Sequence, residues 1–187
     1  MGIWNTLTGR REPPPPKLDQ LFGLPTAALT LQASMSFVTT GRGAICFQGA
    51  AGAAMDDTVK GFVELLNNDD DRPVELSTDQ YGYTWLLSFQ DDIGQLATDL
   101  HAVATSLELQ GFADRLLCAQ ASFHDPSGRS LALVYLAKAG TFYPFAPTAP
   151  NVRDNVLEIQ VRDLLKGELP MEPDLQRWMA LWGAPGL

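Results

Sequence analysis

The side chains best suited to acid–base chemistry are scarce in this chain, which contains only two histidines, His101 and His124. His101 follows Asp99 by two positions in a helical pattern, so these two side chains point to different sides of that helix. His124 ends a predicted strand just before a turn. Either imidazole becomes a general base only if the fold brings a nucleophile within about 3 Å of it. A small hydrolase that uses one of them is therefore an alternative and not the leading interpretation.

Nucleophiles and metal ligands are equally few. Cys46 and Cys118 both lie in apolar runs, which predicts buried thiols that stay reduced. Cys118 and His124 are six residues apart on one predicted strand, or about 20 Å, too far for direct proton transfer. The chain has no G-x-S-x-G elbow, no C-x-x-C pair and no phosphate-binding glycine motif. We therefore expect no catalytic residues, no metal and no cofactor, and a protein that is not an enzyme.

Paired carboxylates could act as acid and base, but those of this sequence have structural explanations. Asp91 and Asp92 stand where a predicted helix begins, and carboxylates there cap free backbone N–H groups. Glu158 and Arg162 lie four positions apart on another predicted helix and are expected to form an ion pair on its exterior. We therefore assign these acidic residues to helix ends and surfaces.

Composition excludes several classes of partner. Thirteen basic and 22 acidic side chains give a formal charge of −9, and no cluster of Lys and Arg offsets it locally. Such a field repels phosphate backbones, so we expect no binding to nucleic acid. Hydrophobic residues make up 45% of the chain, as in ordinary globular proteins, but no apolar run approaches the 20 or so residues that span a bilayer. These features predict a cytoplasmic protein.

The first 16 residues differ from the rest of the chain. Ile3, Trp4 and Leu7 fall on one side of a short helical turn, and Pro13 to Pro16 predict a semi-rigid polyproline spacer. This pattern allows a peripheral membrane contact through the three apolar residues, or a short tail that docks on its own domain. We expect residues 1–16 to form this segment and residues 17–187 to form a single domain.

The remaining hydrophobic patterns predict an α+β fold. Strands joined by tight turns must be antiparallel, and the amphipathic helices between them can all cover one face. We expect a mostly antiparallel sheet of about five strands with helices packed on one face; residues 25–36 fit helix and strand equally well. The predicted strands are 43–48, 74–78, 83–89, 115–123 and 129–138, and the predicted helices are 59–66, 93–107 and one that begins near Asn151.

An aromatic and proline-rich segment, residues 140–151, follows the last predicted strand. Phe142, Tyr143 and Phe145 alternate with prolines that hold an extended path. These rings are either core residues beneath the last helix or a stiff ledge that recognises a partner, to which Trp178 and Trp182 would add a docking edge. A third interpretation is a ligand-sensing pocket, built from Tyr83 and Trp85 with Tyr143 or with His101.

Several stretches also resemble a known family. The segments YGYTWLL (81–87), TDLHAV (98–103), LALVYLAKAGTFYPFAP (131–147), RDNVLEIQV (153–161) and WGAPGL (182–187) are similar to those of PspAB, a PspA-associated family of actinobacteria. The resemblance covers nearly the whole chain. It implies a protein-interaction or adaptor role in the membrane-stress response of PspA, with PspA or a neighbouring stress-response protein as partner. It brings no enzymatic activity to any position.

The predicted order of elements also resembles type III secretion chaperones and YbjN-like proteins. This likeness is one of fold alone, and fold does not establish function. It implies that a helix face or the sheet could bind a partner peptide or pair two copies of the chain as a homodimer.

Overall fold

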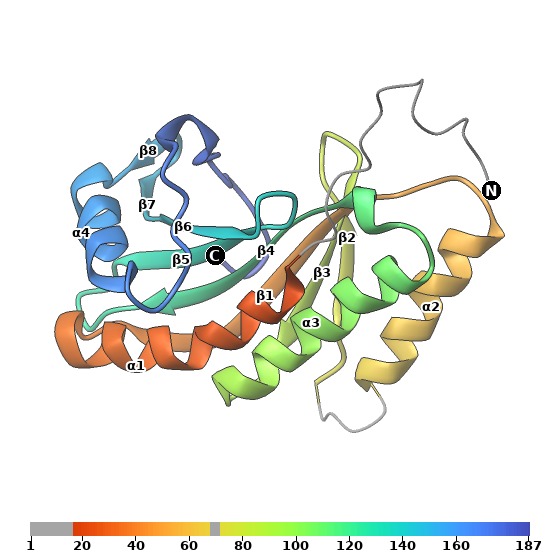
Figure 1. Ribbon diagram of the computed structural model, residues 1–187, viewed down its shortest axis with the longest axis horizontal. Helices are drawn as coiled ribbons and strands as arrows, with labels where there is room; N and C mark the ends of the chain where they lie inside the picture. The colour runs from red at the N-terminus through yellow and green to blue at the C-terminus, as the bar shows by residue number, and fades with distance from the viewer. Residues whose placement is uncertain (1–16, 68–71) are drawn as a thin grey trace, which may run out of the picture.

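A computed structural model describes residues 17–67 and 72–187. Ile3, Trp4 and Leu7, which were predicted to contact a membrane, lie outside the described residues. After a short 3-10 helix (Leu18–Gly23), the elements are α1 (Leu24–Met35), β1 (Val38–Gln48), α2 (Ala53–Asn67), β2 (Glu75–Thr78), β3 (Tyr83–Phe89), α3 (Ile93–Leu109), β4 (Leu116–His124), β5 (Ser130–Leu136), β6 (Thr141–Phe145), β7 (Pro147–Ala149), β8 (Val152–Arg153) and α4 (Asn155–Leu165) (Figure 1).

Six of the strands form one antiparallel sheet in the order β2-β3-β1-β4-β5-β6, and β7 and β8 form a separate ribbon. The α+β class and the antiparallel sheet are confirmed. The predicted number of about five strands was low, because residues 141–145 add a sixth strand at the edge. The ambiguous residues 25–36 form α1 almost throughout.

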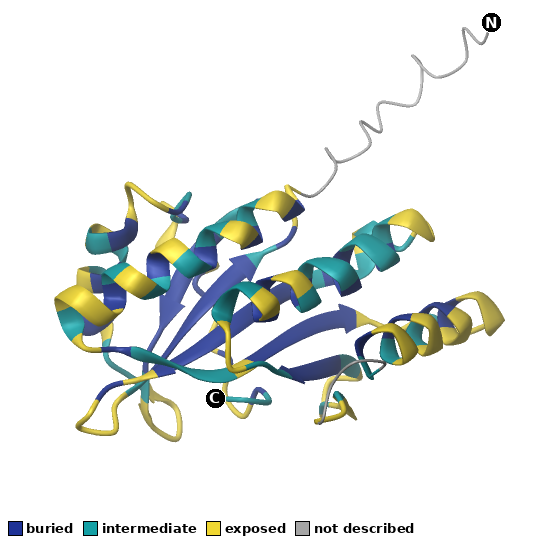
Figure 2. Ribbon diagram, turned by 90° about the horizontal axis from the view of Figure 1, so that it is seen from below, coloured by how far each residue is buried: buried dark blue, intermediate teal, exposed yellow. Residues whose placement is uncertain are grey.

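The helices bury one face of this sheet. Leu96, Leu100, Val103 and Leu107 of α3 are fully buried against it, as the predicted apolar stripe requires. Gly43 lets α3 approach β1 closely, since a Cβ there would lie 2.9 Å from Leu96 Cδ1. The core of this side takes residues from all four helices. Figures 1 and 2 show α1, α2 and α3 along this side, and α4 beside β6.

The other face of the sheet, called here the second face, is covered by the end of the chain. Residues 170–187, the C-terminal segment, pass across it without a long helix. Trp178, Leu181 and Ala184 of this segment are at most 9% exposed and form a second core with inner residues of β1, β3, β4, β5 and β6. In Figure 2 the C-terminus lies on the side of the sheet opposite α1 and α3.

The last helix begins four residues later than predicted. Asn151 has φ +60° in the tight connection between β7 and β8, so it cannot be an N-cap, and Asp154 takes that role by accepting from Leu157 N. Val156 of α4 points outward and is 69% exposed. Leu157, Val161 and Leu165 fill the buried side of α4 instead.

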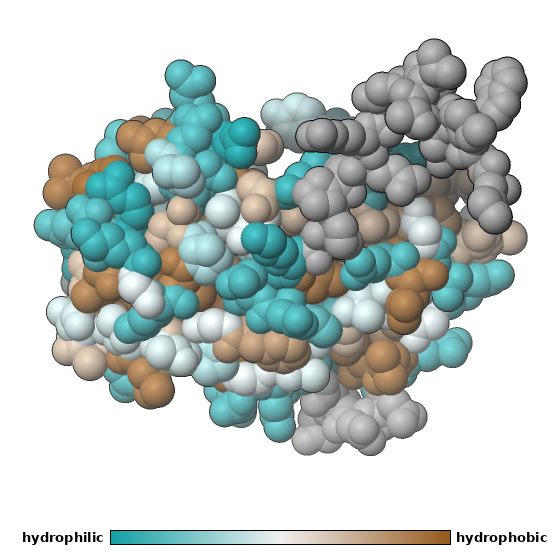
Figure 3. Space-filling model, in the orientation of Figure 1, coloured by the Kyte–Doolittle hydropathy of each residue, from teal (hydrophilic) through white to brown (hydrophobic). Residues whose placement is uncertain are grey.

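The outer surface of the helical side is mixed. In the part of this side that the structure describes, hydrophobic residues lie in small groups among hydrophilic ones (Figure 3). Within the described residues, no helix combines the length and the apolar character that crossing a membrane requires.

Candidate functional site

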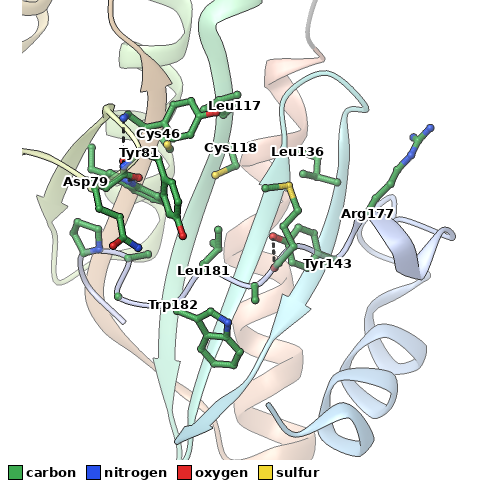
Figure 4. A pocket seen from close by; sticks show the side chains of 18 of the residues that line it. Cys46, Asp79, Tyr81, Leu117, Cys118, Leu136, Tyr143, Arg177, Leu181 and Trp182 are labelled. Atoms are coloured by element: carbon green, nitrogen blue, oxygen red, sulfur yellow. Dashed lines mark hydrogen bonds between the residues drawn. The ribbon is translucent and has the colours of Figure 1, made fainter. Parts of the chain in front are cut away.

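A cavity of about 820 Å³ lies between the second face of the sheet and the C-terminal segment (Figure 4). It sits at one end of the sheet, between the β2–β3 turn and the β5–β6 turn, with β1 and β4 lying between these turns. Aromatic and aliphatic side chains dominate its lining. They come from three sources: the strands (Cys46, Ser77, Thr78, Tyr83, Trp85, Leu117, Cys118, Leu136, Tyr143), the two turns (residues 79–81, 138 and 139) and the C-terminal segment (residues 176, 177 and 179–185).

The floor of the cavity is one row of residues across four strands. Trp85, Cys46, Cys118 and Leu136 are successive partners in the registers of β3, β1, β4 and β5. Directly opposed residues in a sheet project from the same face, so this row presents an indole, two thiols and an isobutyl group to the cavity. The rigid sheet therefore fixes the shape of the floor.

The opposite wall is the C-terminal segment, which polar contacts hold against the sheet. The Tyr143 hydroxyl donates to Met179 O at 3.0 Å, and Gln120 Nε2 donates to Pro185 O at 2.8 Å. The Trp178 ring stacks on the Tyr143 ring with centroids 6.0 Å apart. The wall is thus anchored at both ends, while Trp182 between them is 39% exposed.

Asp79 organises the β2–β3 turn at one side of the cavity. Its Oδ1 accepts from the backbone N–H groups of Tyr81 and Tyr83, and its Oδ2 accepts from Trp85 Nε1 at 3.0 Å. Partial burial raises the pKa of this carboxyl, but the hydrogen bonds from Trp85 and from the turn outweigh it and hold the pKa below its usual range. The carboxylate is therefore committed to positioning Trp85 and Tyr83.

The Cys46 thiol on the floor is a poor nucleophile. A hydrogen bond with Cys118 and burial both raise the pKa of Cys46 well above its usual range, because neither favours a thiolate. Both cysteines are free and buried, as predicted. Their direct pairing on neighbouring strands could not be predicted from the sequence, because they are 72 positions apart.

The burial of the aromatic rings decides between the alternative interpretations of residues 140–151. Phe142, Tyr143 and Phe145 are fully buried, because the segment forms β6 and its two faces pack into the two cores. The exposed partner-binding ledge predicted for these rings is therefore wrong. Trp178 is also a core residue, at 8% exposed, and only Trp182 of the predicted docking edge keeps an open surface.

The residues of the predicted pocket divide between two places. Tyr83, Trp85 and Tyr143 line the same cavity, although they are distant in sequence. His101 is not part of it, since α3 carries this ring on the helical side, where Nε2 lies 3.3 Å from Asp19 Oδ1 and the ring packs on Phe22. Asp19 is 95% exposed, so this contact lies at the surface and not in a pocket.

The other polar residues considered as candidates also have structural positions. His124 is exposed at the end of β4, opposite Val38 and Ser130, away from the cavity. Glu158 does not pair with Arg162 on the exterior of α4. Its buried carboxylate accepts from Arg153 Nε at 2.7 Å and from Ala146 N at 2.8 Å, while Arg162 pairs with Asp163.

The lining of the cavity suits binding better than catalysis. Its one acidic side chain, Asp79, is held by hydrogen bonds, and the Cys46 thiol is held protonated. Among residues 17–67 and 72–187, no group of three or more His, Cys, Asp or Glu side chains is arranged to hold a metal ion. The arrangement offers apolar surface and aromatic rings to a ligand.

Comparison with known proteins gives one match. The family model of PspAB, described as PspA associated protein B, matches residues 1–186. The chain belongs to the PspAB family. This match covers both turns, the floor and the C-terminal segment, so the whole cavity lies within the PspAB region. No curated protein and no solved structure matches the chain.

Proposed function

We propose that this PspAB-family chain is a non-enzymatic adaptor of the PspA stress response, and that it holds an apolar segment of PspA in the cavity on its second face. The observation that carries the proposal is the cavity itself, an apolar site with rigid aromatic walls in a family described as associated with PspA. The expected likeness to type III secretion chaperones has no match among solved structures, so the proposal rests on the cavity and the family alone.

The cavity has the features of a protein-interaction site. Tyr and Trp side chains give large contact areas at low entropic cost and are enriched where partners bind most strongly. Tyr83 and Trp85 are held by the Asp79 turn and Tyr143 by Met179 O, so little ordering is left for the moment of binding. The described part of the helical side offers only small separate apolar groups (Figure 3).

Chemistry at the cavity has less support. The lining contains no histidine, and Cys46 is held as a thiol. A hydrolase would need a nucleophile and a base within hydrogen-bond reach of each other. Adaptor function needs only shape and apolar area, both of which the lining supplies.

Filling the cavity tests the proposal. Ala180 lines the cavity but is exposed, so Ala180→Trp adds an indole there without displacing a buried side chain. We expect calorimetric titration with purified PspA to show at least a tenfold loss of affinity for this variant, because the indole occupies space that the PspA segment needs.

The matched control is Ala33→Trp, an equal change at an exposed position of α1. It should bind PspA as the unmodified protein does, and both variants should keep the unfolding midpoint. Equal affinity of the two variants would place the binding site elsewhere. An unmodified protein that binds no PspA would contradict the adaptor role itself.

A further inference from the structure

The described chain begins beside the cavity. Lys17 packs on Gly140, where an added Cβ would lie 3.2 Å from Lys17 Cβ, and Gly140 has φ +67° in the β5–β6 turn. The two residues before it in that turn, Lys138 and Ala139, line the cavity. Residues 1–16 therefore join the domain beside the β5–β6 turn, of which Lys138 and Ala139 line the cavity.

The sequence of these 16 residues matches what the cavity would accept. Ile3, Trp4 and Leu7 are large apolar side chains within five positions, and residues 8–12 carry none. A cavity of about 820 Å³ lined by Tyr83, Trp85 and Leu181 can take an indole and an isobutyl group together. The rim carries Asp79, Lys138 and Arg177, charges of both signs, so apolar contact and not charge would drive docking.

The geometry of the connection also fits. Four prolines in polyproline conformation span about 12 Å, at about 3.1 Å per residue. The cavity extends across β5, β4, β1 and β3, three strand spacings of about 4.8 Å each. A spacer of this length that starts at the β5–β6 turn is long enough for residues 1–12 to reach the middle of the cavity.

We propose that residues 1–12 of this chain dock in the cavity on the second face, with Trp4 and Leu7 as the anchoring side chains. As a regulatory device this inference rests on the proposed function: the chain's own N-terminal segment occupies the site until PspA displaces it. A tethered segment competes at a high effective concentration, so its removal would raise the apparent affinity for PspA.

Disulfide trapping in the full chain tests this docking without PspA, so its result is independent of the adaptor role. One variant combines Thr6→Cys with Met179→Cys, at the cavity, and the control combines Thr6→Cys with Leu29→Cys, on α1. Met179 and Leu29 are matched in exposure, at 62% and 69%. An undocked segment reaches both positions, since the 11 residues from Thr6 to Lys17 extend to about 36 Å.

We expect the pair at the cavity to form its disulfide at least tenfold faster than the control pair, as followed by peptide mapping under mild oxidation. Adding Trp4→Ser and Leu7→Ser should abolish that preference. Equal rates for the two pairs would overturn the inference, as would a preference that survives the loss of Trp4 and Leu7. It would also be overturned if chains carrying Thr6→Cys and Met179→Cys separately linked as fast as the double variant, since the occupant would then be a second copy.

Discussion

At the scale of single residues, two buried tyrosines on opposite faces of the sheet have opposite hydrogen-bonding states. Tyr143 donates its hydroxyl to Met179 O and so fixes the wall of the cavity. Tyr135 faces the helical core, and among the described residues its hydroxyl is the one buried side-chain group without a hydrogen-bond partner. Burial raises the pKa of both, that of Tyr135 to about 12. Tyr143 thus contributes a bond that Tyr135 lacks.

Replacing each tyrosine by phenylalanine should separate them. We expect Tyr143→Phe to lower the free energy of unfolding by about 1 kcal/mol, because a hydrogen bond is lost. Tyr135→Phe should leave it unchanged or raise it by up to about 1 kcal/mol, because an unpaired buried hydroxyl is removed. Urea unfolding at pH 7 measures both.

The same pair predicts a pH dependence. An unfolded tyrosine titrates near pH 10, so the unfolded state gains stability from ionisation above that pH while Tyr135 stays neutral up to about pH 12. Stability should therefore fall as pH rises from about 10 to 12, and the fall should be smaller in Tyr135→Phe. An identical fall in this variant and the unmodified protein would show that Tyr135 ionises normally in the folded state.

At the scale of elements, Arg153 joins the C-terminal segment to the rest of the fold. It lies on β8, pairs with buried Glu158 of α4, and donates Nη1 to Trp178 O at 2.9 Å. Its guanidinium also lies 5.0 Å from the centre of the Phe145 ring of β6. One side chain therefore ties α4, β6 and the wall of the cavity together.

Removing this cation should destabilise the protein strongly. Arg153→Met leaves the Glu158 carboxylate buried without its charge partner, which typically costs about 3–5 kcal/mol of folding free energy. Arg162→Met is the control, because its pair with Asp163 is half exposed and such pairs contribute about 1 kcal/mol or less. Chemical denaturation compares the two, and similar losses would contradict the role of Arg153 as the joint between these elements.

Elements set by local patterns could be predicted from the sequence. Asp92 caps α3 by accepting from Gln95 N, as its position indicated. Asp125 closes the β4–β5 hairpin by accepting from Ser127 N and Arg129 N, which are local contacts of the same kind. Residues 141–145 were not predicted as a strand, because Pro144 argues against one. The structure places this proline on the edge strand β6, where the missing N–H is tolerated.

The candidate site could not be predicted from local sequence patterns. Its floor depends on the pairing of β1 with both β3 and β4, and its wall on a C-terminal segment that crosses the sheet. Alternation could place Tyr83 and Trp85 on one face of a strand, but no pattern indicates which distant strand lies alongside. The sequence therefore named three of the lining aromatic residues without locating the cavity that they share.

At the scale of the whole molecule, the two faces of the sheet have different roles. Four helices close one face into the larger core, while the other face keeps an open apolar cavity under a segment of irregular structure. The PspAB match covers the residues of both faces of the sheet. The first described residue, Lys17, packs on Gly140 of the β5–β6 turn, beside the cavity. PspA and the N-terminal segment are therefore both proposed to bind on the second face.

Hydrogen exchange of the full chain with and without PspA tests that placement most directly. The account predicts slower exchange on binding in residues 176–185 and in the β2–β3 turn, which line the cavity, and unchanged exchange in α1. Slower exchange confined to α1, α2 and α3, with residues 176–185 unaffected, would contradict it.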